Sequence, residues 1–215
     1  TMGMSMLANF FDIRKDSQAM FEGLEISKNT ALCSEWMNQW PVLFLSFKDV
    51  DGNCFENAYE MLKFALSQAC ITHTYLQQDP KIDDTFQKKF SALKDQTASL
   101  QEVKTSILIL MQMMRDHYGK PVILLIDEYD VPIAKASAKG YYPEMLEVIK
   151  GLMSTALKDN DALRFAVITG CLRIAKESIF TGTNNFVSDT ISSSHLNEYF
   201  GFTQADVDQI LKDAD

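Results

Sequence analysis

Three short runs of apolar residues, each bounded by turn-forming or charged residues, predict buried strands. They cover 42–47, 122–126 and 165–168, and a proline stands just before the first two. A continuous apolar run of this length is typical of a strand that is buried on both faces. The middle run is the clearest of the three and ends abruptly in Asp127 and Glu128.

Apolar residues elsewhere recur every three or four positions, which is the period of an amphipathic helix. Ser99 and Glu102 form a capping box at the start of one of these helices, and Thr203 caps the last one. Residues 14–29 are predicted to be rich in loops. Strands that alternate with helices predict an α/β fold with a parallel sheet. Apart from the helix that Thr203 caps, the predicted helices cover 3–13, 31–39, 55–78, 83–94, 100–117, 143–158 and 173–180.

Polar residues stand at the ends of all three predicted strands, where open parallel sheets bind their ligands. Ser46 and Asp49 stand at the end of the first strand, Asp127 and Glu128 at the end of the second, and Thr169 at the end of the third. An apolar strand that ends in Asp-Glu has the form of a Walker B strand. Asp127 could hold a magnesium ion, and Glu128 could orient or deprotonate a water that attacks a phosphate. The alternative is that the two acids only keep the end of the strand in water.

Several longer segments resemble the bacterial AAA-ATPase-like family. One is the run Ile-Asp-Glu-Tyr-Asp-Val-Pro-Ile at 126–133, and the others are 4–12, 41–50, 168–170, 173–180, 184–185 and 199–203. The resemblance extends over nearly the whole chain. It implies a P-loop NTPase-type fold of three layers, in which helices flank a parallel sheet, and an activity that binds and hydrolyses ATP with Mg²⁺.

The resemblance also implies a role for individual residues. Asp127 would be the magnesium aspartate, Glu128 the catalytic glutamate, and Thr169 the sensor of the γ-phosphate. Arg173 would meet phosphate charge, within one chain or across a subunit boundary of a homo-oligomer. The alternative for Arg173 is an ion pair on the surface.

The family's pattern is incomplete at the start of the chain. Members place a strand and a phosphate loop before the first helix, and Thr1 matches the last Thr of that loop, where it would contact ATP and Mg²⁺. The Gly and Lys residues of the loop are absent, and no G-x-x-x-x-G-K-[ST] occurs elsewhere in the chain. We therefore expect the first strand and the P-loop to be missing and the chain to be a segment of a longer protein. Residues 1–198 would form the ATPase core, and 199–215 the start of a helical lid or linker.

Charge and cysteine content narrow the expected partners. The net charge of −9 disfavours direct binding of this segment to nucleic acid or to anionic membranes. The longest apolar runs are too short to span a bilayer. Four cysteines without a C-x-x-C pair argue against a zinc site and suit a reducing cytoplasm. The resemblance adds a nuclease domain that many family members carry after this region.

Two other functions compete with the ATPase. A metal-dependent nuclease could use Asp127, Glu128 and Asp130, but such sites add an acid-x-Lys pair, and the only candidate, Glu102-Val103-Lys104, lies on a predicted helix. The stronger competitor is a degenerate ATPase-like domain that serves interaction or regulation without turnover. This alternative predicts that the natural protein lacks a phosphate loop.

Overall fold

The computed structural model describes residues 1–171, 187–190 and 203–214. The chain divides into two compact units, 1–183 and 184–215. The expected end of the ATPase core at residue 198 lies outside the described residues and stays a prediction, as does the helix at 173–180. None of the described helices is long and apolar enough to cross a membrane.

The first unit is built on a parallel sheet in the order β1-β2-β3. The strands are β1 (Val42–Ser46), β2 (Val122–Asp127) and β3 (Leu163–Ile168). All six residues of the central strand are buried, as its apolar run predicts. Parallel neighbours cannot be joined by a tight hairpin, so the chain crosses over between strands through helices. The predicted α/β fold with a parallel sheet is confirmed.

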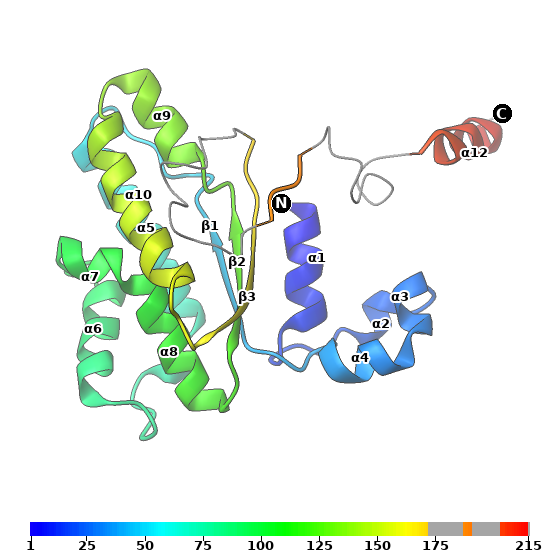
Figure 1. Cartoon of the computed structure of the whole chain (residues 1–215), viewed down its shortest axis with the longest axis horizontal. Coiled ribbons are helices and arrows are strands. Elements are labelled where there is room, and N and C mark those ends of the chain that lie inside the picture. The colour runs from blue at the N-terminus through cyan, green and yellow to red at the C-terminus, as the bar shows by residue number, and fades with distance from the viewer. Residues whose placement is uncertain (172–186, 191–202, 215) are drawn as a thin grey trace. The chain divides into compact units, whose positions relative to one another are not determined.

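Helices cover both faces of the sheet and produce three layers (Figure 1). One face carries α1 (Met2–Phe11), and the other carries α5 (Phe55–Thr72), α8 (Ser106–Tyr118) and α10 (Tyr142–Leu157). Around this second layer pack α6 (Asp84–Lys94), α7 (Leu100–Lys104) and α9 (Val131–Lys139). The short helices α2 (Gln18–Phe21), α3 (Glu25–Lys28) and α4 (Thr30–Trp36) lead from α1 to β1.

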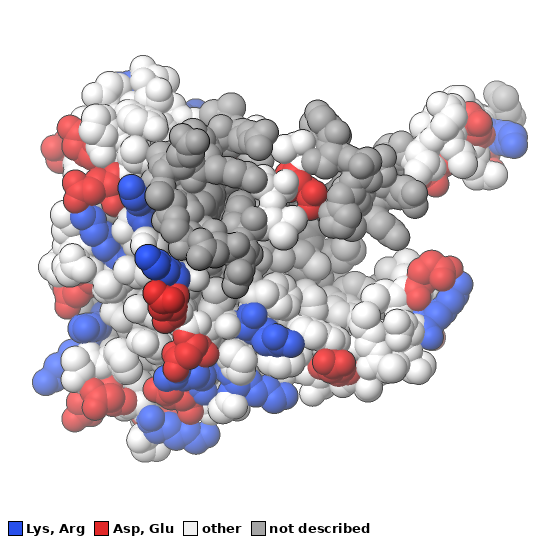
Figure 2. All heavy atoms as spheres, in the orientation of Figure 1, with Lys and Arg blue, Asp and Glu red and all other residues white. Residues whose placement is uncertain are grey.

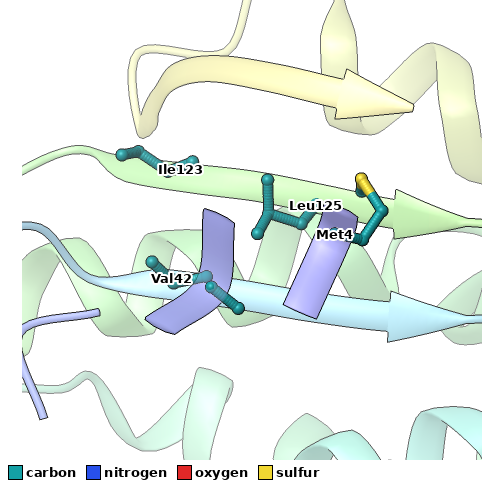
Figure 3. Packing of buried hydrophobic residues seen from close by; sticks show 5 residues of the cluster. Met4, Val42, Ile123 and Leu125 are labelled. Carbon is teal, nitrogen blue, oxygen red and sulfur yellow. The ribbon is translucent and has the colours of Figure 1, made fainter. Parts of the chain in front are cut away.

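An apolar cluster fixes α1 on the sheet. Met4 of α1 packs against Val42 of β1 and against Ile123 and Leu125 of β2 (Figure 3). Side chains two residues apart on a strand face the same side of a sheet, so Asp127 continues the row of Ile123 and Leu125. The carboxylate therefore lies on the face that α1 covers, at the carboxyl end of the central strand.

The structure corrects several predicted helix boundaries. The helix predicted at 55–78 ends at Thr72 and is followed by the 3-10 helix η1 (Thr74–Leu76). The helix predicted at 100–117 is two helices, α7 and α8, because Thr105 interrupts it. The Thr155 hydroxyl of α10 donates to the Lys104 carbonyl at 2.8 Å, a tertiary contact that occupies the last turn of α7. The loop-rich segment contains α2 and α3, and α9 was not predicted.

Both predicted helix caps are present. Ser99 caps α7 together with Glu102. In the second unit, the hydroxyl of Thr203 accepts from the backbone of Asp206 at 3.2 Å and starts α12 (Gln204–Ala214). The carboxylate of Asp206 accepts in return from the backbone of Thr203 at 2.8 Å. On the face shown in Figure 2, acidic and basic side chains are interspersed among the described residues, a pattern that favours solubility.

Candidate active site

The carboxyl ends of the three strands bring the predicted polar residues together. Ser46 and Asp127 are register partners at the ends of β1 and β2. Thr169, just after β3, is held beside β2 because its backbone N–H donates to the Ile126 carbonyl at 2.9 Å. Its hydroxyl donates to Asp127 Oδ1 at 2.7 Å. The predicted proximity of Asp127 and Thr169 is therefore a feature of the folded chain.

Asp127 is a buried carboxylate, and only one of its two oxygens is hydrogen-bonded among the described residues. It is 1% exposed, and its Oδ2 atom has no hydrogen-bond partner among the described residues. Burial opposes its ionisation, but side-chain hydrogen bonds from Thr169 and Thr1 favour the charged form, and its pKa lies below the ordinary value. A buried charge is stable only when it is paired or binds a metal. The free Oδ2 atom is therefore a candidate ligand for a cation.

Glu128 follows in a strained backbone conformation. Its φ of 57° lies in the left-handed region, which residues other than glycine adopt at a cost of about 1–3 kcal/mol. This turn ends the strand and places the side chain, which is partly exposed, near the start of α1. There the Thr1 hydroxyl donates to Glu128 Oε1 at 3.4 Å. Neighbouring carboxylates thus lie in different surroundings, one buried and one within reach of water.

The amino end of α1 faces the same carboxylates. The Thr1 nitrogen lies 3.6 Å from Asp127 Oδ1. The first backbone N–H groups of a helix have no partner within the helix, and they carry partial positive charge that attracts anions. Four of the five predicted site residues, Thr1, Asp127, Glu128 and Thr169, therefore meet at one place. The fifth, Arg173, lies outside the described residues.

Asp130 has a different task from the other acids. It precedes α9, and its Oδ2 accepts from the backbone N–H of Cys171 at 3.0 Å. A Cβ atom on Gly170 would lie 2.5 Å from Asp130 Oδ1 and 2.7 Å from the Tyr129 ring, so the two loops touch as closely as glycine allows. Asp130 therefore ties the loop after β3 to the loop after β2. Sequence reasoning missed this role, for which the spacing of three acids was the only signal.

The structure weakens the nuclease alternative. Glu102 bonds Ser99 as part of the α7 cap, and Lys104 pairs with Glu147 of α10, so this acid-x-Lys pair is engaged elsewhere. Among the described residues, no group of three or more His, Cys, Asp or Glu side chains could hold a metal ion. Magnesium does not need such a group, because one or two carboxylates with waters and phosphate oxygens suffice.

Two hollows of the first unit lie away from the carboxylates and lack their chemistry. A polar hollow of about 930 Å³ lies among residues 15–38. An apolar groove of about 480 Å³ runs between α1, α4 and Phe165 of β3. Neither is lined by a buried carboxylate in the part of the chain that the structure describes. We therefore place the candidate site at Asp127 on chemical grounds rather than on volume.

Comparisons with known proteins identify the family of the chain. Residues 1–180 match the model of a family described as predicted AAA-ATPase. An uncharacterized protein in the vnfD 5' region of Azotobacter chroococcum mcd 1 is 36% identical over 97 residues. The match covers 43% of this chain and 18% of that relative, so the chain spans only a small part of the relative's length. No solved structure matches the chain.

Proposed function

This chain belongs to the predicted AAA-ATPase family, and from that premise we propose that its first unit is part of an ATPase domain which, completed by the phosphate loop of a longer protein, binds ATP with Mg²⁺ and hydrolyses it at Asp127 and Glu128. The observation that carries the proposal is the buried Asp127 carboxylate, whose lowered pKa keeps it ionised and whose Oδ2 atom has no partner among the described residues. The adjacent amino end of α1 favours the phosphate groups that would accompany the ion.

Asp127 would hold the magnesium ion through Oδ2, directly or through a water, and the Thr1 hydroxyl would be its second ligand from this chain. Bound Mg²⁺ would neutralise charge on the phosphate oxygens. A site with so few protein ligands suits magnesium, which keeps several of its waters. Glu128 would orient the attacking water and accept its proton, a role that its partial exposure allows.

Thr169 has a more specific role in this proposal than the sequence suggests. Its hydroxyl proton is donated to Asp127, so the same proton cannot also be donated to a phosphate. Thr169 would first position Asp127 and would sense the γ-phosphate only by turning its proton away from the carboxylate. The role of Arg173 stays a prediction, as do a homo-oligomer, a nuclease domain in the whole protein and a cytoplasmic location.

The substitution Glu128→Gln tests the catalytic part of the proposal. It removes the proton acceptor and keeps the size of the side chain, so ATP binding should persist while turnover is lost. Glu35→Gln is a matched control, because Glu35 is exposed on α4 and loses the same charge. Equal hydrolysis by the wild type and Glu128→Gln would refute the role given to Glu128. Binding without turnover in the wild type would favour the alternative of a degenerate, non-catalytic interaction or regulatory module.

A further inference from the structure

Ser46 carries a second buried polar atom without a partner at the same edge of the sheet. Its Oγ atom is buried and, like Asp127 Oδ2, has no hydrogen-bond partner among the described residues. An unpaired buried hydroxyl is costly in a folded protein, so each case calls for an explanation. Two such atoms on neighbouring strands call for one explanation that covers both.

Register places the two side chains on the same side of the sheet. Ser46 and Asp127 are paired across the parallel strands β1 and β2, and the next backbone N–H, that of Phe47, donates to the Asp127 carbonyl at 3.0 Å. Paired residues of neighbouring strands point to the same face, and the strands lie about 4.8 Å apart. A water that lies between two polar atoms can make an ordinary hydrogen bond to each of them.

We propose that Ser46 is a positioning residue of the ion site, and that its hydroxyl and Asp127 Oδ2 hold one water of the magnesium hydration shell between them. The proposal rests on the proposed function, since it needs a cation at Asp127. Thr169 occupies Oδ1 from the β3 side, and Ser46 acts on Oδ2 from the β1 side. The carboxylate would thus be oriented from both neighbouring strands.

This arrangement would favour magnesium over calcium. Mg²⁺ releases its waters reluctantly and is bound through them, whereas Ca²⁺ takes six to eight oxygen ligands directly in a looser geometry. A hydroxyl that fixes one bound water therefore stabilises the smaller ion more. Loss of a partner outside the first coordination shell lowers metal affinity by about 10- to 100-fold in other sites.

The test compares Ser46→Ala with Ser46→Thr, which keeps the hydroxyl and suits a strand. Binding of Mn²⁺, as a paramagnetic stand-in for Mg²⁺, is followed by electron paramagnetic resonance at saturating ADP, and Ca²⁺ is measured by competition. We expect Ser46→Ala to weaken Mn²⁺ binding by about 10-fold and Ca²⁺ binding by less, and Ser46→Thr to retain wild-type affinity. Without ions, Ser46→Ala should melt at or above the wild-type temperature, since an unpaired hydroxyl is removed.

Asp127→Asn separates failure of this inference from failure of the proposed function. If Asp127→Asn loses Mn²⁺ while Ser46→Ala binds both ions like the wild type, Ser46 has no part in the site and the inference is overturned. An equal loss of Mn²⁺ and Ca²⁺ affinity in Ser46→Ala would overturn the selectivity. If the wild type and Asp127→Asn bind Mn²⁺ equally, the proposed ion site itself is wrong, and the inference falls with it.

Discussion

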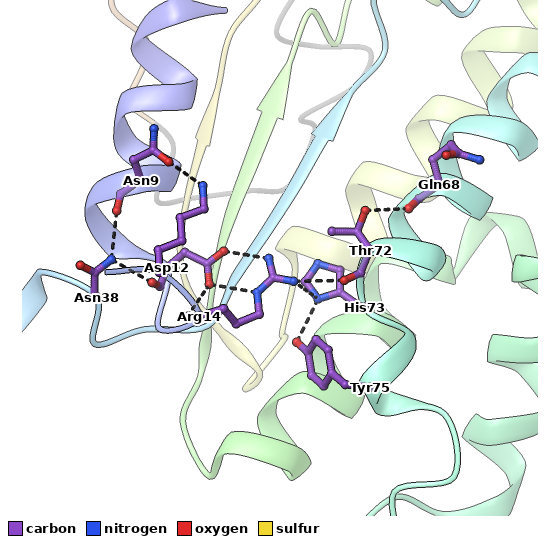
Figure 4. Close-up of polar contacts among 9 residues, drawn as sticks. Asn9, Asp12, Arg14, Asn38, Gln68, Thr72, His73 and Tyr75 are labelled. Carbon is purple, nitrogen blue, oxygen red and sulfur yellow. Dashed lines mark hydrogen bonds and ion pairs between the residues drawn. The ribbon is translucent and has the colours of Figure 1, made fainter. Parts of the chain in front are cut away.

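An ion pair between buried Asp12 and partly exposed Arg14, at the far end of α1, offers a direct test of how this helix is held. Asp12 ends α1 and is 2% exposed, and Arg14 binds it through two nitrogens at 2.7 and 3.1 Å (Figure 4). The same guanidinium donates to the carbonyl of Thr72, the last residue of α5, at 3.2 Å. Arg14 therefore joins helices that lie on opposite faces of the sheet.

The substitution Arg14→Met keeps the aliphatic part of the side chain and removes the charge. Among the described residues, Asp12 would keep only the backbone N–H of residue 14 as a donor to its side chain, with the nitrogen 3.0 Å from its Oδ1 atom. Removing one partner of a buried pair costs about 3–5 kcal/mol, because the other charge stays buried without compensation. The Arg14 side chain is 28% exposed, so water can approach Asp12 after the change, and we expect the lower end, about 3 kcal/mol.

Urea unfolding monitored by circular dichroism measures this loss. The control Lys88→Met removes a positive charge from an exposed position of α6 and should change the free energy of unfolding by less than about 0.5 kcal/mol. Adding Asp12→Asn to Arg14→Met removes the stranded charge and should recover part of the loss. A cost below about 1 kcal/mol for Arg14→Met, as for an exposed pair, would refute the reasoning.

Two further predictions concern the turn after β1 and the carboxylate site. Gly52→Ala should destabilise the protein by about 1–3 kcal/mol, because its Cβ would lie 2.3 Å from the backbone nitrogen of Ala58. Gly3→Ala, whose Cβ meets nothing within 4 Å, should instead stabilise helix α1. Melting temperatures equal to that of the wild type for both variants would contradict both expectations. Asp127 has a lowered folded pKa, so its ionised form adds stability above the ordinary value of 3.8, and that stability is lost as pH falls through the folded pKa. Thr169→Val removes one cause of the shift and should move this acid loss of stability to higher pH in urea titrations; an unchanged profile would contradict the role of that hydrogen bond.

Local patterns in the sequence were sufficient to predict the sheet and most helices. Each strand is a short apolar run with a clear boundary, but only β2 is buried along its whole length. The prediction that β3 is buried was wrong, because β3 stands at one end of the order β1-β2-β3 and its residues are partly exposed. Helix α9 was missed although Pro132 in its first turn and Gly140 at its end are ordinary helix signals. The break at Thr105 could not be predicted from a local pattern, because it accompanies a hydrogen bond from Thr155, which belongs to a different helix far along the chain.

The candidate site was predictable in its residue types but not in its geometry. Asp127, Glu128 and Thr169 stand at strand ends, and strand order alone brings them close together. The free oxygen of Asp127 and the pairing of Ser46 with it depend on register, which no local pattern specifies. The left-handed turn at Glu128 could not be predicted either, since glutamate has no preference for that conformation.

Calorimetric titration with ATP in the presence and absence of Mg²⁺, on the wild-type protein extended upstream through the phosphate loop and on its Asp127→Asn variant, tests the central claim most directly. The account predicts that the wild type binds ATP more tightly with Mg²⁺. It also predicts that Asp127→Asn loses this magnesium-dependent gain and keeps its affinity for ATP alone. Equal magnesium-dependent binding by both proteins would contradict the assignment of Asp127 as the residue that holds the ion.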